Sequence, residues 1–526
     1  MEEDKAAMTG QHLEDIHASD EKNEHTISTS PQEQGRVTGW LVALLSLIAI
    51  IPFICNFDVS FTGVALAMPS FNNTFGTKCT VSTTGAKSCS LTTTQQALIY
   101  IPYLFNAIGG GLAGLIGKFI GRRGCITVGS AFTIIGASAI LGVQSELSHL
   151  IISKSVVGTG LGMLLAVGIT YGAESTSAEK RDTLLALFNV GLCLGNMTTA
   201  AMAVGTSKFA NTDDWQWKTM VAVQIPLGVL LGSGIWLFPE SPRWLIEKGK
   251  DEKAREAFSK FSGEDAHSET MTRRIETIHF HLAEGRAVQK ETSWLDLYRG
   301  TDLRRTLISG FLLTALALCG TQFVVPYTAL FLKDLHIASS WINNVIVASC
   351  IVGGSLVAPF TLTVFGCRRS LITGFGVMSA SMIVFSAVST GLGSGHHTAQ
   401  IVLVVCFCIW TFVLGSCVGA SVWQLSVDMH TGRLRTYGQA STTITYQLFG
   451  FAAGFWTPYM LGVDYGDMGT NVGYFYFAVD LVLGVIAFLA VPETSRLSLE
   501  EMDDYFASGK PAWTTSYRRN KAVHVE

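Results

Sequence analysis

Charged side chains are scarce in this sequence. Asp, Glu, Lys and Arg together supply 14% of the 526 residues, whereas a typical soluble domain carries about 25%, and 48% of the residues are hydrophobic. So few ionic groups cannot coat a soluble body of this size. The charges are also segregated, because they concentrate in residues 1–36, in a central segment at 239–305 and near the end of the chain. The composition therefore indicates a membrane protein.

Two kinds of sequence signal are missing. No spacing of Cys and His suits a metal ion, and no nucleophile or cofactor motif is present, so we expect neither an enzyme nor a cofactor, a bound metal or a nucleic-acid partner. A cleavable signal peptide is also lacking, because the chain begins with acidic residues and the first apolar run starts only at Trp40. We expect the first helix itself to direct insertion.

Long apolar runs dominate what is present. Each has about the length needed to cross the hydrocarbon core of a bilayer as a helix. They lie near residues 40–55, 97–117, 125–144, 150–172, 184–205 and 219–238, and after the charged interruption near 306–332, 341–365, 371–391, 400–425, 437–462 and 473–491. This pattern predicts an all-α membrane protein with twelve transmembrane helices in two six-helix halves, a layout found in many secondary transporters.

The same pattern divides the chain. We expect a disordered tail at 1–37, which is acidic and rich in Ser, Thr and Gln, and six-helix bundles at 38–238 and 306–491. A linker at 239–305 joins the bundles and contains short helices, because Ala254, Phe258 and Phe261 recur at helical spacing among charges. A second tail covers 492–526.

Basic residues predict the orientation. They occur in alternate turns between the apolar runs, which places them all on one side of the membrane: Lys118, Arg122, Arg123, Lys180, Arg181, Arg368, Arg369, Arg433 and Arg435. An excess of Lys and Arg marks the cytoplasmic side. Both termini and the linker are then cytoplasmic.

The opposite side contains a hydrophilic segment at residues 70–95. Asn72 opens an Asn-Asn-Thr acceptor for glycosylation. Cys79 and Cys89 are the only two of eleven cysteines in a hydrophilic segment on this face. In an oxidising compartment they would form a disulfide, and the alternative is a pair of free surface thiols.

Ionisable residues near or inside the apolar runs are expensive in lipid and indicate function. Asp58 follows the first run, Lys154 lies early in the fourth, Asp428 ends the tenth and Asp480 interrupts the twelfth. Asp58 and Lys154 could pair across a central cavity, so that protonating the carboxylate releases the lysine. Such a release would couple a proton to a conformational change. The alternative places Asp58 among the lipid headgroups.

Several short motifs occur along the chain in the order typical of one family. PESPRWL occupies residues 239–245, VPETS 491–495 and LEEMD 499–503, and they are accompanied by Phe57-Asp58, by Tyr171-Gly172-Ala173-Glu174 with Arg181, and by Trp217-Lys218 with Gln224 and Pro226. This set resembles the sugar porters of the major facilitator superfamily over residues of about 38–506. The resemblance implies a carrier that works by alternating access.

Motifs of the second half resemble a narrower group. Asp428 with Arg433-Leu434-Arg435, Thr457-Pro458-Tyr459-Met460-Leu461 and Tyr327-Thr328-Ala329-Leu330-Phe331 look like segments of fungal alpha-glucoside and disaccharide permeases. That resemblance implies a disaccharide or glycoside carrier of the plasma membrane, driven by protons.

The resemblance also implies a sugar site. It falls on polar residues of the fifth, seventh, tenth and eleventh helices, namely Asn189, Asn196, Gln322, Tyr327, Trp423, Tyr446 and Gln447. Amides supply paired donors and acceptors for sugar hydroxyls, and an indole stacks on the apolar face of a pyranose. Each of these residues could instead be an ordinary interhelical hydrogen-bonding group. Residues Leu316 to Gly320 stand where the seventh helix of the family usually has glutamines, which argues against a binding site of the hexose type.

A cytoplasmic gate is implied in the same way. Its candidates are charged residues at helix ends: Arg122, Arg123, Glu174, Arg181, Glu240, Arg243, Arg368, Arg369, Asp428, Arg435 and Glu493. The alternative reading is that they only set the topology. The loop motif GxxxDxxGRR has Lys118 at its Asp position, and its second copy, read from Val364 to Arg369, loses both the Asp and the Gly. In the family this Asp belongs to a cytoplasmic charge cluster that stabilises one conformation, so its loss puts that cluster in question.

Three functions remain open. The first is a proton-coupled carrier of a disaccharide or similar glycoside, with Asp58 as proton acceptor and Lys154 as its partner. The second is a sugar sensor with little transport, and the third is an uncoupled sugar facilitator. The expected partners are a small sugar, protons and the lipid bilayer, and the protein is expected to be a monomer.

Overall fold

The computed structural model describes residues 38–81, 87–176, 181–291, 294–334, 340–393, 396–431, 434–495, 502 and 505–515. The tail expected to be disordered at 1–37 lies outside these ranges, as does most of the chain beyond Ser495. Within the described ranges almost all ordered structure is helical.

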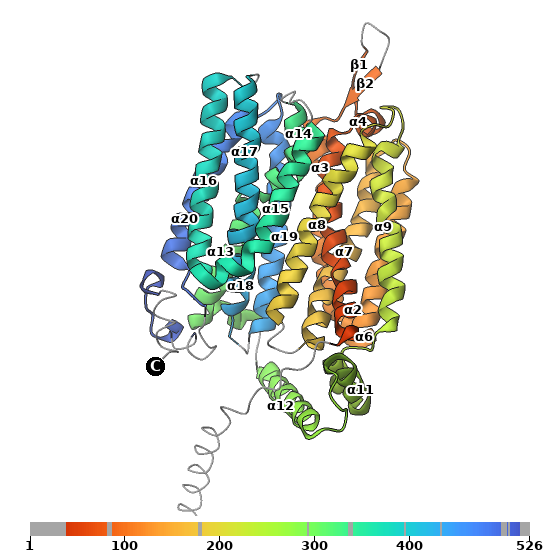
Figure 1. Cartoon of the computed structure of the whole chain (residues 1–526), viewed down its shortest axis with the longest axis vertical. Coiled ribbons are helices and arrows are strands. Elements are labelled where there is room, and N and C mark those ends of the chain that lie inside the picture. The colour runs from red at the N-terminus through yellow and green to blue at the C-terminus, as the bar shows by residue number, and fades with distance from the viewer. Residues whose placement is uncertain are drawn as a thin grey trace, which may run out of the picture.

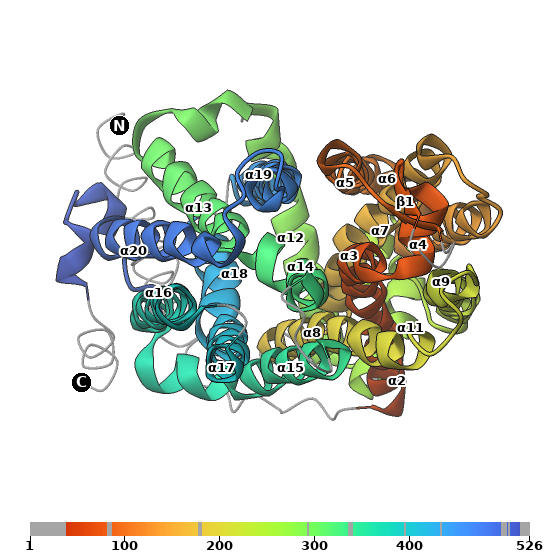
Figure 2. The same cartoon turned by 90° about the horizontal axis from the view of Figure 1, so that it is seen from above.

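Two helical bundles stand side by side (Figures 1 and 2). The first contains α2 (Gly39–Ile48), α3 (Ile50–Ala67), α5 (Thr93–Leu98), α6 (Pro102–Leu141), α7 (Leu147–Ser175), α8 (Arg181–Thr206) and α9 (Trp215–Gly234). The second contains α13 (Gly300–Leu318), α14 (Thr321–Asp334), α15 (Ser340–Phe365), α16 (Cys367–Leu392), α17 (His397–Val413), α18 (Gly419–Asp428), α19 (Arg435–Leu461) and α20 (Val472–Ala490). A π-helical turn, Leu414–Val418, joins α17 to α18.

The helices are long enough to cross a membrane. Nine segments of the described chain are both long and apolar enough, and one of them, Thr93–Leu141, contains two crossings because Gly121 has φ +83° and breaks α6. Helices α8 and α19 add 26 and 27 residues. The prediction of an all-α membrane fold is confirmed, and the described segments account for twelve crossings.

The two ends of the bundle differ (Figure 1). At one end, after the short helix α4 (Pro69–Phe75), the strands β1 (Lys78–Val81) and β2 (Lys87–Ser90) form an antiparallel hairpin in which Cys79 faces Cys89. We call this end the hairpin side. At the other end lie α10 (Pro242–Glu247), α11 (Asp251–Ser262) and α12 (Glu269–Glu291), and we call it the linker side.

The linker helices have a small core of their own. Trp244 and Leu245 of α10 pack with Phe258 of α11 and with Met271 and Ile275 of α12. Thr38 at the start of α2 donates a hydrogen bond to the carbonyl of Phe261 at 2.8 Å, which fixes α11 beneath the first bundle.

The two bundles contact each other tightly at the hairpin side. Helix α19 packs on α5 and on the start of α6, where a Cβ at Gly454 would lie only 2.3 Å from Cδ1 of Tyr100, and one at Gly462 would lie 2.7 Å from Oγ1 of Thr93. Helix α3 packs on α14, and α8 packs on α15. An ion pair also joins Lys78 of the hairpin to Asp464 after α19. Glycine is needed at these positions because a side chain would separate the bundles.

Candidate functional site

Asp58 and Lys154 form a buried ion pair. Asp58 lies inside α3, and Lys154 Nζ in α7 is 3.2 Å from each carboxylate oxygen and 3.3 Å from the Asp58 carbonyl oxygen. The side chains of Asp58 and Lys154 are 10% and 7% exposed. Gln224 of α9 donates to the same carboxylate at 3.3 Å. This geometry matches the predicted pairing and argues against a position among lipid headgroups.

A small pocket adjoins the pair. Its lining includes Asp58, Lys154, Thr62, Tyr103 and Asn106. The side-chain oxygen of Asn106 is buried and has no hydrogen-bond partner among the described residues. A buried amide oxygen of this kind requires a partner, so the pocket suits a water molecule or a ligand hydroxyl.

The asparagines expected to contact sugar both lie on α8. Asn196 is buried and accepts a hydrogen bond from Ser60 of α3 at 2.8 Å. This contact ties α8 to α3, which is the interhelical role that the alternative interpretation gives it. Asn189, seven residues earlier on α8, is half-buried.

The remaining candidates come together around Tyr103. Gln322 of α14 is buried and donates to the Tyr103 hydroxyl at 3.1 Å. The phenol of Tyr446 of α19 lies next to that of Tyr103, and the Tyr446 ring lies 5.7 Å from the ring of Trp423 at an angle of 63°.

Two predicted sugar-site residues remain, Gln447 and Tyr327. Gln447, next to Tyr446, has a buried side-chain oxygen with no partner among the described residues. The side chain of Tyr327 lies outside the described residues. Sequence reasoning missed Tyr103 and Asn106, and the available signal was a pair of neutral polar residues within an apolar run.

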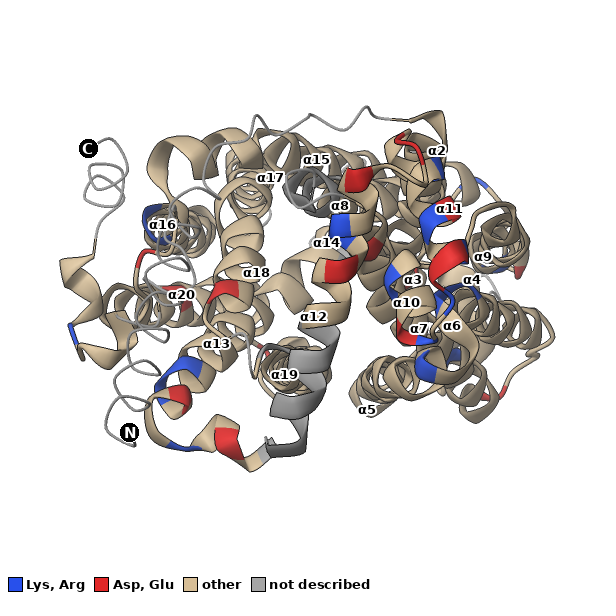
Figure 3. Cartoon of the chain, turned by 90° about the horizontal axis from the view of Figure 1, so that it is seen from below, with Lys and Arg blue, Asp and Glu red and all other residues tan. Residues whose placement is uncertain are grey.

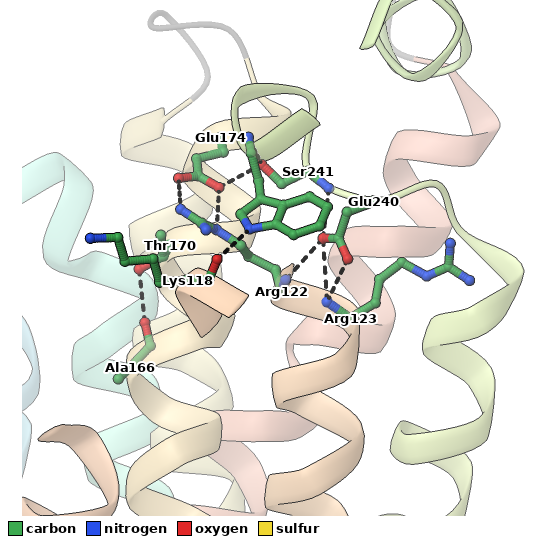
Figure 4. A network of polar contacts seen from close by, with 9 residues as sticks. Lys118, Arg122, Arg123, Ala166, Thr170, Glu174, Glu240 and Ser241 are labelled. Carbon is green, nitrogen blue, oxygen red and sulfur yellow. Dashed lines mark hydrogen bonds and ion pairs between the residues drawn. The ribbon is translucent and has the colours of Figure 1, made fainter. Parts of the chain in front are cut away.

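The linker side of the first bundle contains a network of charges (Figure 4). Arg122 donates to both oxygens of Glu174, at 2.9 and 2.8 Å, and Ser241 donates to Glu174 at 2.6 Å. Glu240 accepts the backbone N–H groups of Arg122 at 3.0 Å and of Arg123 at 3.3 Å. Burial raises the pKa of Glu240, and these backbone hydrogen bonds oppose the shift. Glu240 therefore caps the helix segment that begins after Gly121.

The second bundle repeats this cap with different residues. Glu493 accepts the backbone N–H groups of Cys367 at 3.1 Å and of Arg368 at 3.2 Å, at the start of α16. Thr494 donates to Asp428 at 2.9 Å, as Ser241 does to Glu174.

The two arginines that follow the caps also correspond. Arg368 donates to the carbonyls of Val491 at 2.7 Å and Phe488 at 2.8 Å. Arg123 likewise donates to the carbonyl of Trp236 at 2.9 Å. In both bundles an arginine thus binds the end of the last crossing helix of its own bundle.

The correspondence between the two helix caps corrects the predicted alignment of the second loop motif with the first. Gly366 has φ +80°, as Gly121 has φ +83°, so the glycine is retained and the Asp position falls on Thr363 rather than Val364. Cys367 then stands where the first bundle has Arg122. A thiol cannot form the bidentate contact that a guanidinium makes with a carboxylate. The sequence alignment was one residue out because Arg368 and Arg369 resemble the Arg122-Arg123 pair.

Other gate candidates take no part in these networks as far as they are described. Arg243 and Arg369 are exposed, and the side chains of Arg181 and Arg435 lie outside the described residues. Charged residues gather on the linker side of both bundles (Figure 3). Among the described gate candidates, however, each hydrogen bond and ion pair given above joins residues of one bundle. Contacts between the bundles are instead made by α19 with α5 and α6, by α3 with α14 and by α8 with α15.

Two further predictions concern the hairpin side: the disulfide between Cys79 and Cys89, and glycosylation of Asn72. Cys79 and Cys89 form a disulfide. Asn72 lies inside α4, where its side-chain nitrogen donates to the carbonyls of Leu66 at 2.8 Å and Met68 at 3.1 Å. A glycan would attach to that nitrogen and replace these bonds, so Asn72 glycosylation stays a prediction that must compete with a structural role.

The fold and the polar interior between two bundles are those of a secondary transporter. A profile described as "Sugar (and other) transporter" matches residues 44–506, and the chain belongs to this family. It is a multi-pass membrane transporter of the sugar porter type within the major facilitator superfamily, and it is not an enzyme.

Two curated relatives are fungal. The chain is 26% identical over 469 residues to the MFS transporter fmqE of Aspergillus fumigatus, covering 88% of this chain and 86% of the relative. It is 24% identical over 433 residues to the high-affinity fructose transporter ght6 of Schizosaccharomyces pombe, covering 81% and 80%.

Solved structures share the fold. The inward-open xylose transporter XylE of E. coli matches with a TM-score of 0.71 at 18% identity, covering 89% of this chain and 100% of that chain. The proton:xylose symporter XylE bound to 6-bromo-6-deoxy-D-glucose matches with a TM-score of 0.70 at 19% identity, covering 89% and 99%.

Proposed function

We propose that this protein is a proton-coupled sugar carrier of the plasma membrane, with its linker side and both termini in the cytoplasm. The buried Asp58–Lys154 pair supports this proposal most strongly, with Nζ 3.2 Å from both carboxylate oxygens. An ionisable pair inside the membrane is expensive and is a typical element of proton pathways. The basic turns of the linker side support the orientation.

The pair can act as a proton switch. When Asp58 is ionised, Lys154 binds it and α3 is tied to α7. Protonation neutralises the carboxyl group and removes this attraction, which leaves Lys154 near the Phe61 ring, 5.0 Å away. Because α3 also packs on α14 of the other bundle, a change at this contact alters how the bundles meet. Proton binding can therefore bias alternating access.

The sugar would bind between the bundles, at Gln322, Trp423 and Tyr446, with Gln447 offering an unpaired oxygen. Amides and a phenol suit sugar hydroxyls, and the indole suits a pyranose face. The disaccharide class is our finer proposal and rests on the resemblance of the second half to disaccharide permeases. Monosaccharides belong in the same test, because relatives are named for fructose and for gluconate.

The gate residues would then alternate between two arrangements. In the present one α19 packs closely on α5 and the start of α6 at the hairpin side, and the charge networks described for the linker side stay within their own bundles, as we expect of an arrangement that faces the cytoplasm. In the outward-facing arrangement we expect Glu174, Arg122 and their counterparts in the second bundle to meet across the linker side. Cys367 makes the second network weaker than the first.

Uptake by a transporter-deleted yeast expressing the chain tests this proposal. Labelled glucose, fructose, maltose, cellobiose and lactose are supplied at acidic and neutral external pH, with and without a protonophore. We expect accumulation that rises at acidic pH and collapses with the protonophore. Asp58→Asn should abolish accumulation but retain exchange of sugar across the membrane, whereas Asp265→Asn, at an exposed linker position, should behave as wild type.

Other outcomes would replace the proposal. Uptake whose rate changes with neither the external pH nor the protonophore would identify an uncoupled facilitator. Sugar binding without uptake would identify a sensor. Wild-type accumulation in Asp58→Asn would remove Asp58 from the proton pathway.

A further inference from the structure

Tyr103 connects the two bundles through its hydroxyl group. It lies near the start of α6 in the first bundle, and its hydroxyl accepts a hydrogen bond from Gln322 of α14 in the second at 3.1 Å. The phenol of Tyr446 of α19 lies next to the same hydroxyl. Gly450 of α19 keeps this approach open, because a Cβ there would lie 3.2 Å from Cε1 of Tyr103 and 3.4 Å from Nε2 of Gln322.

The same side chain also lines the pocket at the ion pair. Tyr103 lies in that lining together with Asp58, Lys154 and the unpartnered Asn106. One residue therefore contacts both the sugar candidates of the second bundle and the space next to the proton candidate of the first. Among the described residues, no other side chain is placed in both groups by these contacts.

We propose that Tyr103 is the positioning residue that links sugar occupancy to the protonation of Asp58. The proposal rests on the proposed function and deepens it. A sugar hydroxyl that takes the Gln322 amide removes a hydrogen bond from Tyr103. The Tyr103 ring is then free to move within the lining of the pocket, which changes access to Asp58.

The link is reciprocal by thermodynamic necessity. If sugar binding changes the affinity of Asp58 for a proton, protonation changes the affinity for sugar by the same factor. The groups near Asp58 from the elements around it are Lys154 of α7, Gln224 of α9, Tyr103 of α6 and Cys55 of its own helix. Of these, only Tyr103 is also hydrogen-bonded to Gln322 and adjacent to Tyr446 in the described structure.

Tyr103→Phe removes the hydroxyl and keeps the ring. We expect sugar exchange across the membrane to persist, while protonophore-sensitive accumulation falls to the external concentration. The wild-type KM for sugar should decrease as external pH is lowered, and the KM of the variant should be the same at pH 5 and pH 7. Tyr474→Phe removes the same atom at an exposed position of α20 and should keep the wild-type pH dependence.

Gly450→Ala provides a second test from the opposite side of the contact. The added methyl group crowds Tyr103 and Gln322 without removing a polar atom, so it should also flatten the pH dependence of KM. It covers the case in which Tyr103→Phe fails to reach the membrane. Surface expression and sugar exchange confirm that each variant is folded.

The outcomes separate this inference from the proposed function. If Asp58→Asn abolishes accumulation while Tyr103→Phe and Gly450→Ala keep a wild-type accumulation ratio and pH-dependent KM, the link through Tyr103 is wrong and proton coupling stands. If Asp58→Asn accumulates sugar normally, proton coupling through Asp58 is wrong as well. Loss of coupling in Tyr103→Phe with retained exchange supports both.

Discussion

Trp423 is the side chain best suited to stack on a sugar ring. It is 36% exposed on α18, and its ring meets the Tyr446 ring at an angle of 63° and a centroid distance of 5.7 Å. Partial exposure at a position fixed by another aromatic residue leaves a ring face available to a ligand. Its contact with Tyr446, which lies next to Tyr103, places a phenol near the indole.

Trp423→Ala should weaken sugar binding. Loss of a stacked ring costs about 1 kcal/mol or more, which corresponds to about a fivefold increase in Kd. Binding to purified protein, followed by scintillation proximity, measures the change. Trp215→Ala, at an exposed tryptophan of the hairpin side, is the control and should leave Kd unchanged. An unchanged Kd in Trp423→Ala would show that the sugar binds at another site.

The sequence predicted the charged pair but not its neutral neighbours. Asp58 and Lys154 could be found because an acid and an amine in apolar runs have few stable positions apart from each other. Tyr103 and Asn106 carry no charge and cost little in an apolar run, so nothing in the sequence separates them from structural residues. Asn196 was assigned to sugar by resemblance, and the contact with Ser60 became visible only when α3 and α8 were placed together.

At the scale of single elements, the two helix caps stabilise corresponding positions of the bundles. Glu240 and Glu493 each place a carboxylate against the first N–H groups of a crossing helix, where the helix dipole favours negative charge. The chain reaches the first cap through Gly121, whose φ of +83° is unfavourable for any other residue. A Cβ there would also lie 2.4 Å from Oε2 of Glu240.

Gly121→Ala should therefore destabilise the first bundle. The positive φ alone costs about 1–3 kcal/mol in a residue with a side chain, and displacement of Glu240 adds to this cost. The apparent melting temperature in detergent, measured by fluorescence-detected size exclusion, should fall. Gly376→Ala, at a helical glycine of α16 with no atom within 4 Å of its Cβ position, should not lower it. Equal melting temperatures would contradict the proposed role of the cap.

Helix positions were predicted well from apolar runs, including the breaks after residues 117 and 365, but the backbone conformation that makes each break was not. The break in α6 depends on Gly121 and the one at the start of α16 on Gly366, and each is recognised by its positive φ rather than by hydropathy. The hairpin at 78–90 was also missed, because its strands contain only four residues each and consist mainly of polar residues, without an apolar alternation that would indicate a sheet.

At the scale of the whole molecule, close packing at the hairpin side closes one end of the sugar path. Helix α19 approaches α5 and α6 at Gly454 and Gly462 with no room for a Cβ. This contact must separate for sugar to enter from the hairpin side and must form again for its release at the linker side. The stability of this contact therefore sets the balance between the two arrangements.

Gly454→Ala should disfavour closure. A methyl group 2.3 Å from Cδ1 of Tyr100 would overpack the contact, at a cost of about 1–3 kcal/mol, which is about fivefold to a hundredfold in the equilibrium between the closed and open arrangements. We expect slower uptake with sugar binding from the hairpin side retained. Gly310→Ala, where no atom lies within 4 Å of the Cβ position, should transport normally. Unchanged uptake in Gly454→Ala would show that this contact does not limit transport.

Proton movement driven by sugar tests the central claim most directly. The purified protein is reconstituted into liposomes that contain a pH-sensitive dye, and the transported sugar is added outside without any imposed pH gradient. The account predicts acidification of the lumen on sugar addition, its loss in Asp58→Asn, and retained sugar counterflow in that variant. Sugar entry by the wild type without acidification would contradict proton coupling.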